Sequence, residues 1–332
     1  MKPILEIKNL VKHFPVKGGI FSRSHEFVHA VDGVSFDILP GETFGLVGES
    51  GCGKSTVAQL LLRLLEPDAG SIFFDGHDIS HLSHKQMKPL RREMQIIFQD
   101  PYASLNPRMM VQEILMEPFL IHKIGNRAER EKRVAELLDK VGLPESAASR
   151  YPHEFSGGQR QRIGIARAIA LKPKLIVADE PVSALDVSIR GEIINLLLDL
   201  QKEEGLSYLF ISHDLRLVEH ISHRIAVMYL GKIVETFPAE ALGTAKHPYT
   251  HALVSAVPKA NPNEKKKRIL LSGDVPSPLH PPSACSFHPR CKWAKEVCSQ
   301  VTPVFEAYQQ NQFAACHFKE TIPPLSEELF KG

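Results

Sequence analysis

A glycine-rich segment from Gly48 to Thr56 constrains the fold of this chain more than any other feature. It reads Gly-Glu-Ser-Gly-Cys-Gly-Lys-Ser-Thr and fits the pattern G-x-x-x-x-G-K-[ST]. The apolar run at 43–47 predicts a buried strand before it, and residues 57–65 predict a helix that ends before Pro67. Strand, glycine loop and helix form the context in which this motif binds phosphate, because loop N–H groups and a helix N-terminus both attract anions.

The loop predicts a site for a nucleoside triphosphate and its magnesium ion. In this motif the lysine, here Lys54, reaches the β- and γ-phosphates, and the hydroxyl of Ser55 ligates Mg²⁺. A glycine-rich turn with a chance lysine is the alternative, and the flanking elements disfavour it. The ATP-binding residues expected in the loop are Gly48, Ser50, Gly51, Cys52, Gly53, Lys54, Ser55 and Thr56.

Composition excludes several classes of protein. The hydrophobic fraction of 43% and charged fraction of 23% are typical of a globular protein, and a net charge of +2 predicts no nucleic-acid partner. No secretory leader and no membrane-spanning apolar run are evident, so we expect a cytoplasmic protein, in which disulfides are rare.

Strands that alternate with helices predict an α/β fold with a mostly parallel sheet. The composition changes near Pro258, which predicts a nucleotide-binding domain at 1–257, with a helical subdomain at about 100–170, and a C-terminal extension at 258–332. Strands are expected near 3–11, 28–38, 43–47, 71–76, 94–98, 175–178, 207–211, 224–229 and 232–235. Residues 102–150 are expected to be helical, and further helices are expected at 159–171, 188–203 and 215–223.

A second nucleotide signature is the apolar run 175–178 followed by Asp179 and Glu180. At the carboxyl end of a strand both carboxylates would face a bound ligand. Asp179 would hold the Mg²⁺ shell, and Glu180 would polarise the attacking water as a general base. His213 and Gln99 also close strands and could position the γ-phosphate, Mg²⁺ and water, although a lone polar residue at a strand end is more often a cap.

The segment from Ser156 to Gln159 predicts a second anion site. Ser156 caps a helix, and Gly157 and Gly158 permit close backbone approach to a phosphate. An ordinary capped helix start is the alternative. A phosphate-directed motif about 100 residues from the first makes physical sense if it serves the ATP of another chain.

Together these motifs resemble the ATPase subunits of ATP-binding cassette (ABC) transporters. The resemblance covers roughly residues 3–240 and implies a P-loop NTPase of the ABC type, with a parallel-sheet core, an antiparallel β subdomain and a helical subdomain. The matching segments are Gly48–Ser55 (Walker A), Gln99 (Q-loop), Phe155–Gln159 (signature), Leu175–Glu180 (Walker B), Ser183–Asp186 (D-loop) and His213 (switch histidine).

The resemblance also implies roles for particular residues. Phe14 matches the aromatic residue that stacks on adenine, with a core phenylalanine as the alternative. Two ATPases would close head to tail on two ATP molecules. The implied catalytic residues are Glu180, His213 and Gln99. The implied Mg²⁺ ligands are Ser55, Gln99 and Asp179. The residues expected to face the partner's ATP are Ser156, Gly157, Gly158, Gln159 and Asp186.

Three further segments, 181–190, 247–253 and 273–278, are similar to the oligopeptide/dipeptide importer branch of this family. The resemblance implies an ATP-hydrolysing subunit at the cytoplasmic face of the inner membrane. Its partners would be a second, related ATPase, two permease subunits and, indirectly, an extracytoplasmic peptide-binding protein. A nickel, glutathione or antimicrobial-peptide importer is an alternative, as is a soluble cassette protein outside transport.

Residues 100–121 follow Gln99 and are expected to form the groove that receives a permease helix, with core packing as the alternative. The apolar side chains expected to line it are Met109, Met110, Leu115, Met116 and Phe119.

Four cysteines near the C-terminus have the spacing C-x₅-C-x₆-C-x₁₇-C. They lie in a proline-rich tail with few apolar residues, which needs a crosslink or a metal for stability. A disulfide framework conflicts with the cytoplasm, zinc sites usually show tighter pairs, and four thiolates also suit an iron–sulfur cluster. The family resemblance implies a [4Fe–4S] cluster, and Zn²⁺ or free thiols remain alternatives. The cysteines concerned are Cys285, Cys291, Cys298 and Cys316.

Overall fold

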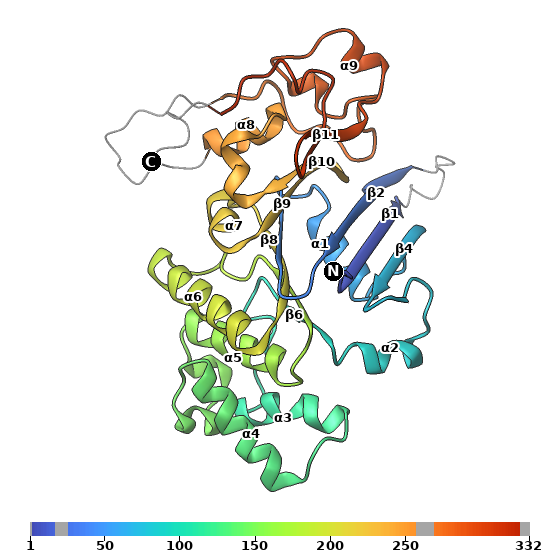
Figure 1. The fold of residues 1–332 in the computed structure, drawn as a ribbon. Coiled ribbons are helices and arrows are strands. Elements are labelled where there is room, and N and C mark those ends of the chain that lie inside the picture. The colour runs from blue at the N-terminus through green and yellow to red at the C-terminus, as the bar shows by residue number, and fades with distance from the viewer. Residues whose placement is uncertain (1, 17–25, 257–268, 326–332) are drawn as a thin grey trace. The chain divides into compact units, whose positions relative to one another are not determined.

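A computed structural model describes residues 2–16, 26–256 and 269–325 (Figure 1). The chain forms two compact units. The first comprises Met1–Ile4, Ile38–Glu42 and Leu82–Ile211, and the second comprises Leu5–Asp37, Thr43–His81 and Ser212–Gly332. The boundary predicted at 257/258 lies outside the described residues.

The first unit contains three parallel strands, as the alternating pattern predicts. β7 (Leu175–Asp179) lies between β6 (Met94–Ile97) and β8 (Ser207–Ser212), and both pairings are parallel. Helix α6 (Val187–Glu204) connects β7 to β8, and Gly205 ends it in the left-handed conformation with φ +67°. All residues of β7 before Asp179 are buried, so this strand presents its last carboxylate at the end of an apolar core.

Helices α3 (Val111–Ile121), α4 (Arg127–Lys140) and α5 (Gly157–Ile169) pack on one another in the same unit (Figure 1). Each turns an apolar face inward, which explains the packing. The expectation of helix over 102–150 is confirmed for α3 and α4 but is wrong for residues 102–110, which form turns. The unit also contains helix α2 (His84–Leu90) and two short 3₁₀ turns, η1 (Glu145–Ser149) and η2 (Pro152–Glu154).

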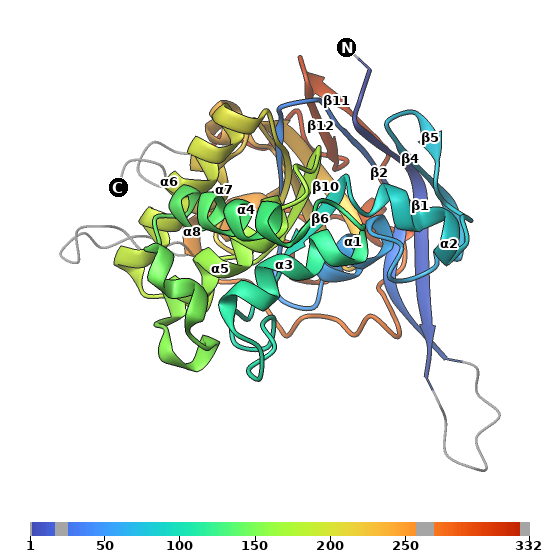
Figure 2. The ribbon, with the colours of Figure 1, turned by 90° about the horizontal axis from the view of Figure 1, so that it is seen from below.

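The second unit contains a four-stranded sheet with the order β2-β1-β4-β5 (Figure 2). β1 pairs antiparallel with β4, and β4 with β5. The bounds are β1 (Leu5–Pro15), β2 (Phe27–Ile38), β4 (Ala69–Phe74) and β5 (His77–Asp78).

A further group of strands in the second unit begins with β3 (Thr43–Val47), which pairs parallel with β9 (Arg224–Tyr229). β9 forms the expected hairpin with β10 (Lys232–Pro238). The sequence reading missed a second hairpin, β11 (Phe305–Gln309) and β12 (Gln312–Ala315), which adds antiparallel to β10. Helix α1 (Lys54–Leu61) begins three residues earlier than expected, directly at the phosphate-loop lysine.

The tail of the second unit is held by a buried carboxylate. Glu235 of β10 accepts hydrogen bonds from the backbone N–H groups of Lys246 and His247 and from the hydroxyls of Thr250 and Tyr308. Burial raises the pKa of Glu235. The surrounding elements are α7 (Leu215–Ile221), η3 (Ala239–Thr244), α8 (Pro248–Ala256), η4 (His288–Arg290) and α9 (Val297–Gln300).

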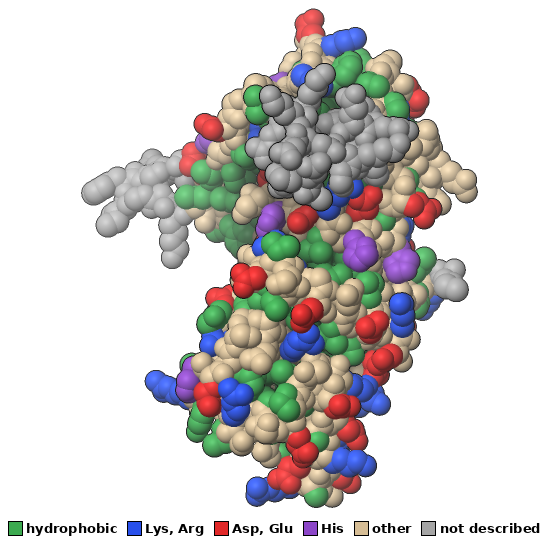
Figure 3. Space-filling view, turned by 90° about the vertical axis from the view of Figure 1, so that its left-hand side faces the viewer, with side chains coloured by type: hydrophobic (Ala, Val, Ile, Leu, Met, Phe, Trp, Pro, Cys, Tyr) green, Lys and Arg blue, Asp and Glu red, His purple; other side chains and the backbone are tan. Residues whose placement is uncertain are grey.

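Basic and acidic side chains are interspersed on the face drawn in Figure 3, in keeping with the net charge of +2. Within the described ranges, no helix is both long and apolar enough to cross a membrane.

Candidate ATP-hydrolysis site

The phosphate loop lies in the second unit, between β3 and α1, as the sequence predicts. Two of its glycines, Gly51 and Gly53, have φ of +81° and +108°, which disfavours side chains. At Gly48 a Cβ atom would lie 2.2 Å from the carbonyl oxygen of Met228, and at Gly53 only 2.0 Å from that of Ala30. Close packing against backbone atoms therefore leaves no room for a side chain at Gly48 or Gly53. Helix α1 begins directly after the loop.

Lys54 is folded back against this loop. Its side chain is buried, and Nζ donates to the carbonyl oxygens of Gly48 at 2.8 Å and Glu49 at 3.0 Å. Neutral carbonyls hold the ammonium without neutralising it. The cation and the first-turn N–H groups of α1 are thus a donor set that fits phosphate.

Two other predicted residues of the second unit are accessible. Phe14, in β1, is half-buried, with Lys12 Nζ 5.6 Å from its ring centroid, so it is not a core phenylalanine. His213 is exposed in the turn between β8 and α7. The next residue, Asp214, caps α7 by accepting from the N–H groups of Arg216 and Leu217.

The first unit brings together two of the three predicted catalytic residues. Gln99 Nε2 donates to Glu180 Oε2 at 3.1 Å, although the two are 81 residues apart. Glu180 has φ +47°, a strained conformation for a non-glycine residue and one that clusters at functional sites. Its N–H donates to the Ile211 carbonyl of β8 at 2.9 Å, which holds the strained residue beside Asp179.

The predicted signature forms the first turn of α5. Ser156 Oγ accepts from the Gln159 N–H, and Gln159 Oε1 accepts from the Ser156 N–H, so the two residues form a capping box. A Cβ atom on Gly158 would lie 2.5 Å from Ile189 Cγ2 of α6, and one on Gly157 3.5 Å from Leu185 Cδ2. The signature therefore abuts the D-loop, and Asp186 is the N-cap residue of α6.

The groove predicted at 100–121 is only partly accessible. Leu115 and Phe119 are 0% and 1% exposed, so their expected place on a docking surface is wrong: they fill the core among α3, α4 and α5. Tyr102 is 60% exposed, and the guanidinium carbon of Arg160 lies 3.9 Å from its ring centroid. Arg160 belongs to α5, so this segment touches the signature helix.

A contact of the phosphate loop that sequence reasoning missed comes from the C-terminal tail. Arg290 binds the Glu49 carboxylate through both terminal nitrogens, at 2.7 and 3.1 Å, and the Glu49 N–H donates to the Tyr249 hydroxyl at 2.8 Å. The Glu49 carboxylate raises the pKa of the Arg290 guanidinium. Tyr249 lies in the segment 247–253, which is similar to the oligopeptide/dipeptide importer branch, and this similarity could have marked it as functional. No sequence pattern around Arg290 indicated its contact with the phosphate loop.

The same side of the loop borders a cavity of about 250 Å³. It is walled by the loop residues 49–52, by Tyr229 and Leu230 of the β9–β10 hairpin, and by residues 275–278. The backbone of residue 278 is tied to β2, because the His29 N–H donates to the Pro278 carbonyl at 3.0 Å.

Comparisons with known proteins agree with this geometry. Residues 31–183 match the family model described as "ABC transporter", and 234–298 match "Oligopeptide/dipeptide transporter, C-terminal region". The oligopeptide transport ATP-binding protein AppF of Bacillus subtilis is 53% identical over 318 residues, which cover 95% of this chain and 97% of that protein. The glutathione import ATP-binding protein GsiA of Salmonella paratyphi A is 58% identical over 281 residues, which cover 84% of this chain and 45% of that protein.

Among solved structures, the dimeric post-hydrolysis state of the ATP-binding cassette MJ0796 bound to ADP and Pi has a TM-score of 0.63 and 29% identity. The matched region covers 71% of this chain and 98% of the MJ0796 chain. The chain is thus an ATPase with the ABC fold. It belongs to the oligopeptide/dipeptide branch of the ABC transporter family.

The prediction of an iron–sulfur protein is corrected. The names of the relatives describe ATP-binding proteins of transporters and mention no iron–sulfur cluster, and the C-terminal model is described as a transporter region. The four cysteines line a cavity of about 20 Å³, which is room for roughly one water. Aromatic side chains and three histidines, His247, His288 and His317, also line it. Burial raises the pKa of the Cys291 thiol to about 11 and that of the Cys316 thiol to about 12.

The Zn²⁺ alternative is not supported either. Among the described residues, the cysteine sulfur atoms do not form a group of three or more within 4.8 Å of one another. None of the four cysteines forms a disulfide in the described part of the chain, and the Cys285 N–H donates to the Cys298 carbonyl at 3.1 Å.

Proposed function

We propose that this chain is the ATP-hydrolysing subunit of a membrane importer for peptides and that Glu180 is its general base. The observation that carries the catalytic assignment is the Gln99–Glu180 hydrogen bond at the end of β7, next to Asp179. The Glu180 carboxylate accepts that bond, and a carboxylate is the form that can take a proton from water.

Binding of ATP would use the phosphate loop. Lys54 would exchange its two carbonyl partners for phosphate oxygens, which form stronger, charge-assisted hydrogen bonds. Phe14 would stack on the adenine ring. The residues that would hold Mg²⁺ are Ser55, Gln99 and Asp179, and the ion would neutralise charge on the phosphates.

In hydrolysis, Glu180 would take the proton of the attacking water while Gln99 holds the carboxylate in place. The strained backbone of Glu180 supports this role, because strain persists where surrounding bonds impose a conformation. His213 would donate a hydrogen bond to the γ-phosphate.

The signature implies a second cassette subunit. The first-turn N–H groups of α5 and the hydroxyl of Ser156 would meet the partner's ATP, and Asp186 would lie at the same interface. The partner would be a related ATPase, and each would contribute its signature to the other's nucleotide.

Coupling to two permease subunits would pass through Tyr102. An exposed tyrosine stacked on Arg160 of the signature helix can transmit displacement of the docking segment to α5. Arg167, also in α5, donates to the Ser104 carbonyl at 2.7 Å and would add a second connection. These contacts would place the chain at the membrane through its permeases.

Two substrate classes are supported by the relatives. AppF is named for oligopeptide transport and is similar over nearly its whole length, which favours oligopeptides. GsiA is named for glutathione import and is 58% identical over 281 residues, which supports a short peptide such as glutathione as the second candidate.

The test of catalysis is Glu180→Gln in the assembled transporter. We expect ATP binding to be retained and steady-state hydrolysis to fall about 100-fold or more, the usual scale for loss of a general base. Glu203→Gln, at an exposed position in α6, is the matched control and should hydrolyse ATP normally. Near-normal turnover by Glu180→Gln would refute the role, and loss of turnover in both variants would point to a defect in assembly.

A further inference from the structure

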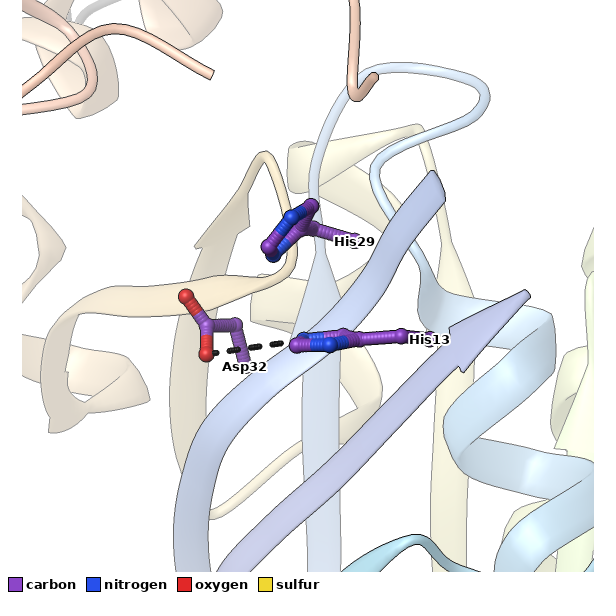
Figure 4. Close-up of side chains that lie close together, drawn as sticks. All are labelled: His13, His29 and Asp32. Carbon is purple, nitrogen blue, oxygen red and sulfur yellow. Dashed lines mark ion pairs between the residues drawn. The ribbon is translucent and has the colours of Figure 1, made fainter. Parts of the chain in front are cut away.

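We propose that His13, His29 and Asp32 form a binding site for a divalent transition metal of the Zn²⁺ class. Figure 4 shows the three side chains together, with His13 on β1 and the other two on β2. One potential ligand atom of each lies within 4.8 Å of those of the other two. The imidazole rings are 4.1 Å apart between centroids and inclined by 48°.

The distances are close to those of a bound metal. Zn–N and Zn–O bonds of about 2.0–2.1 Å place tetrahedral ligand atoms roughly 3.3 Å apart. Rotation of half-buried side chains can close the remaining gap without moving the strands. The His13 and Asp32 side chains are 28% and 33% exposed, so the cluster lies near the surface, and the same side-chain rotation would open the covered His13 Nε2 to an ion.

An unsatisfied atom supports the assignment. His13 Nε2 is shielded from solvent and makes no hydrogen bond, and it lies 3.8 Å from Asp32 Oδ1. A buried polar atom without a hydrogen-bond partner destabilises the folded state. A metal between His13 Nε2 and Asp32 Oδ1 would remove that cost and use the carboxylate oxygen nearer to the ring.

A competing cation lies beside the site. Lys232 Nζ of β10 contacts the other carboxylate oxygen, Asp32 Oδ2, at 3.2 Å. It leaves Oδ1 available, but its charge opposes a second cation, so the affinity should be moderate. Two imidazoles and one carboxylate favour Zn²⁺, Ni²⁺ or Cu²⁺ over Mg²⁺ or Ca²⁺, which prefer oxygen ligands.

The site is tied to the nucleotide loop through two backbone hydrogen bonds. The Asp32 N–H donates to the Gly231 carbonyl at 2.9 Å, and the Gly231 N–H donates to the Cys52 carbonyl at 2.9 Å. Phe14 follows His13 directly in the chain. A bound metal would therefore join β1 to β2 beside the loop and the residue proposed to stack on adenine.

The experiment is a titration of the purified full-length chain with Co²⁺, a spectroscopic substitute for Zn²⁺, followed by competition with Zn²⁺. We expect one Co²⁺ bound with d–d absorption and without a thiolate-to-cobalt charge-transfer band, because the ligands are nitrogen and oxygen. His29→Asn and Asp32→Asn should each weaken binding at least about tenfold, and His77→Asn, at an exposed position in β5, should bind normally.

Three results would overturn the proposal. They are the absence of binding in the parent chain, undiminished binding in both His29→Asn and Asp32→Asn, and a charge-transfer band that persists in those variants, which would place the metal on the C-terminal cysteines. The titration needs no hydrolysis, so its outcome is independent of whether Glu180 is the general base. Thermal unfolding of each variant without metal checks that the fold is intact.

Discussion

Replacing Arg290 with methionine keeps most of the side-chain length but removes the two hydrogen bonds to Glu49. Arg290 is 8% exposed, while the Glu49 side chain is 28% exposed, so solvent screens the pair only in part. Charge-assisted hydrogen bonds contribute about 1.5–3 kcal/mol in such settings. Arg290 Nε is buried without a partner, and its loss returns part of that stabilisation. We therefore expect the free energy of unfolding to fall by about 2 kcal/mol.

The assay is thermal and denaturant unfolding without nucleotide, in a double-mutant cycle with Glu49→Gln. A loss of about 2 kcal/mol corresponds to a decrease in Tm of roughly 4–8 °C for a unit of this size, and the coupling between the two substitutions should be about 1–2 kcal/mol. Lys292→Met, at an exposed position two residues away, is the control and should change stability by less than about 0.5 kcal/mol. A coupling below about 0.5 kcal/mol would show that the tail does not stabilise the loop through this pair.

Three further outcomes are expected. Burial lowers the pKa of His247 to about 3, and the neighbouring His251 adds to this effect. As pH falls below about 6.5, His247 therefore binds a proton in the unfolded chain but not in the folded chain. The free energy of unfolding should therefore fall as pH falls from about 6.5 toward 3. Urea unfolding should show that His247→Asn reduces this dependence of stability on pH by up to about 1.4 kcal/mol per pH unit. An unchanged dependence would contradict the lowered pKa of His247. Gly158→Ala should lower the free energy of unfolding by about 1–3 kcal/mol, because the new Cβ would lie 2.5 Å from the facing isoleucine of α6. The control, Gly164→Ala, adds a Cβ that meets no atom within 4 Å and should be neutral or stabilising. A cysteine at Tyr102 should crosslink to the permease in the assembled transporter and one at buried Leu115 should not; the reverse pattern would exclude the proposed docking segment.

The phosphate loop and the acidic strand end were predictable because their physics is local. A mostly apolar run of five residues, a set of glycines and one lysine specify strand, turn and helix within about 20 residues of chain. The alternation of strands and helices predicted parallel strands, and the parallel pairing of β6, β7 and β8 confirms it, although the sequence did not predict which strands pair. The hydrogen bond between Gln99 and Glu180 agrees with the prediction that both act in catalysis but does not test their roles.

Contacts between distant segments were not predictable. Arg290 and Glu49 are 241 residues apart, and neither has a local pattern that indicates an ion pair. Leu115 and Phe119 are apolar residues in an amphipathic helix, and sequence alone could not say whether their face meets a permease or the core. The β11–β12 hairpin was missed because two strands of five and four residues, with β11 mostly exposed, carry little hydrophobic pattern.

The place of β12 has a consequence for synthesis of the chain on the ribosome. When β9 and β10 have emerged, β10 presents an edge without its neighbour, and the carboxylate of Glu235 lacks the hydroxyl of Tyr308, which lies 73 residues later. An open strand edge beside an incompletely satisfied buried acid is a template for pairing with other chains. The nascent protein therefore passes through an interval of aggregation risk that ends only when residues 312–315 are made. Conditions that slow translation of the last quarter of the message should lower the yield of soluble protein more than the same delay placed earlier.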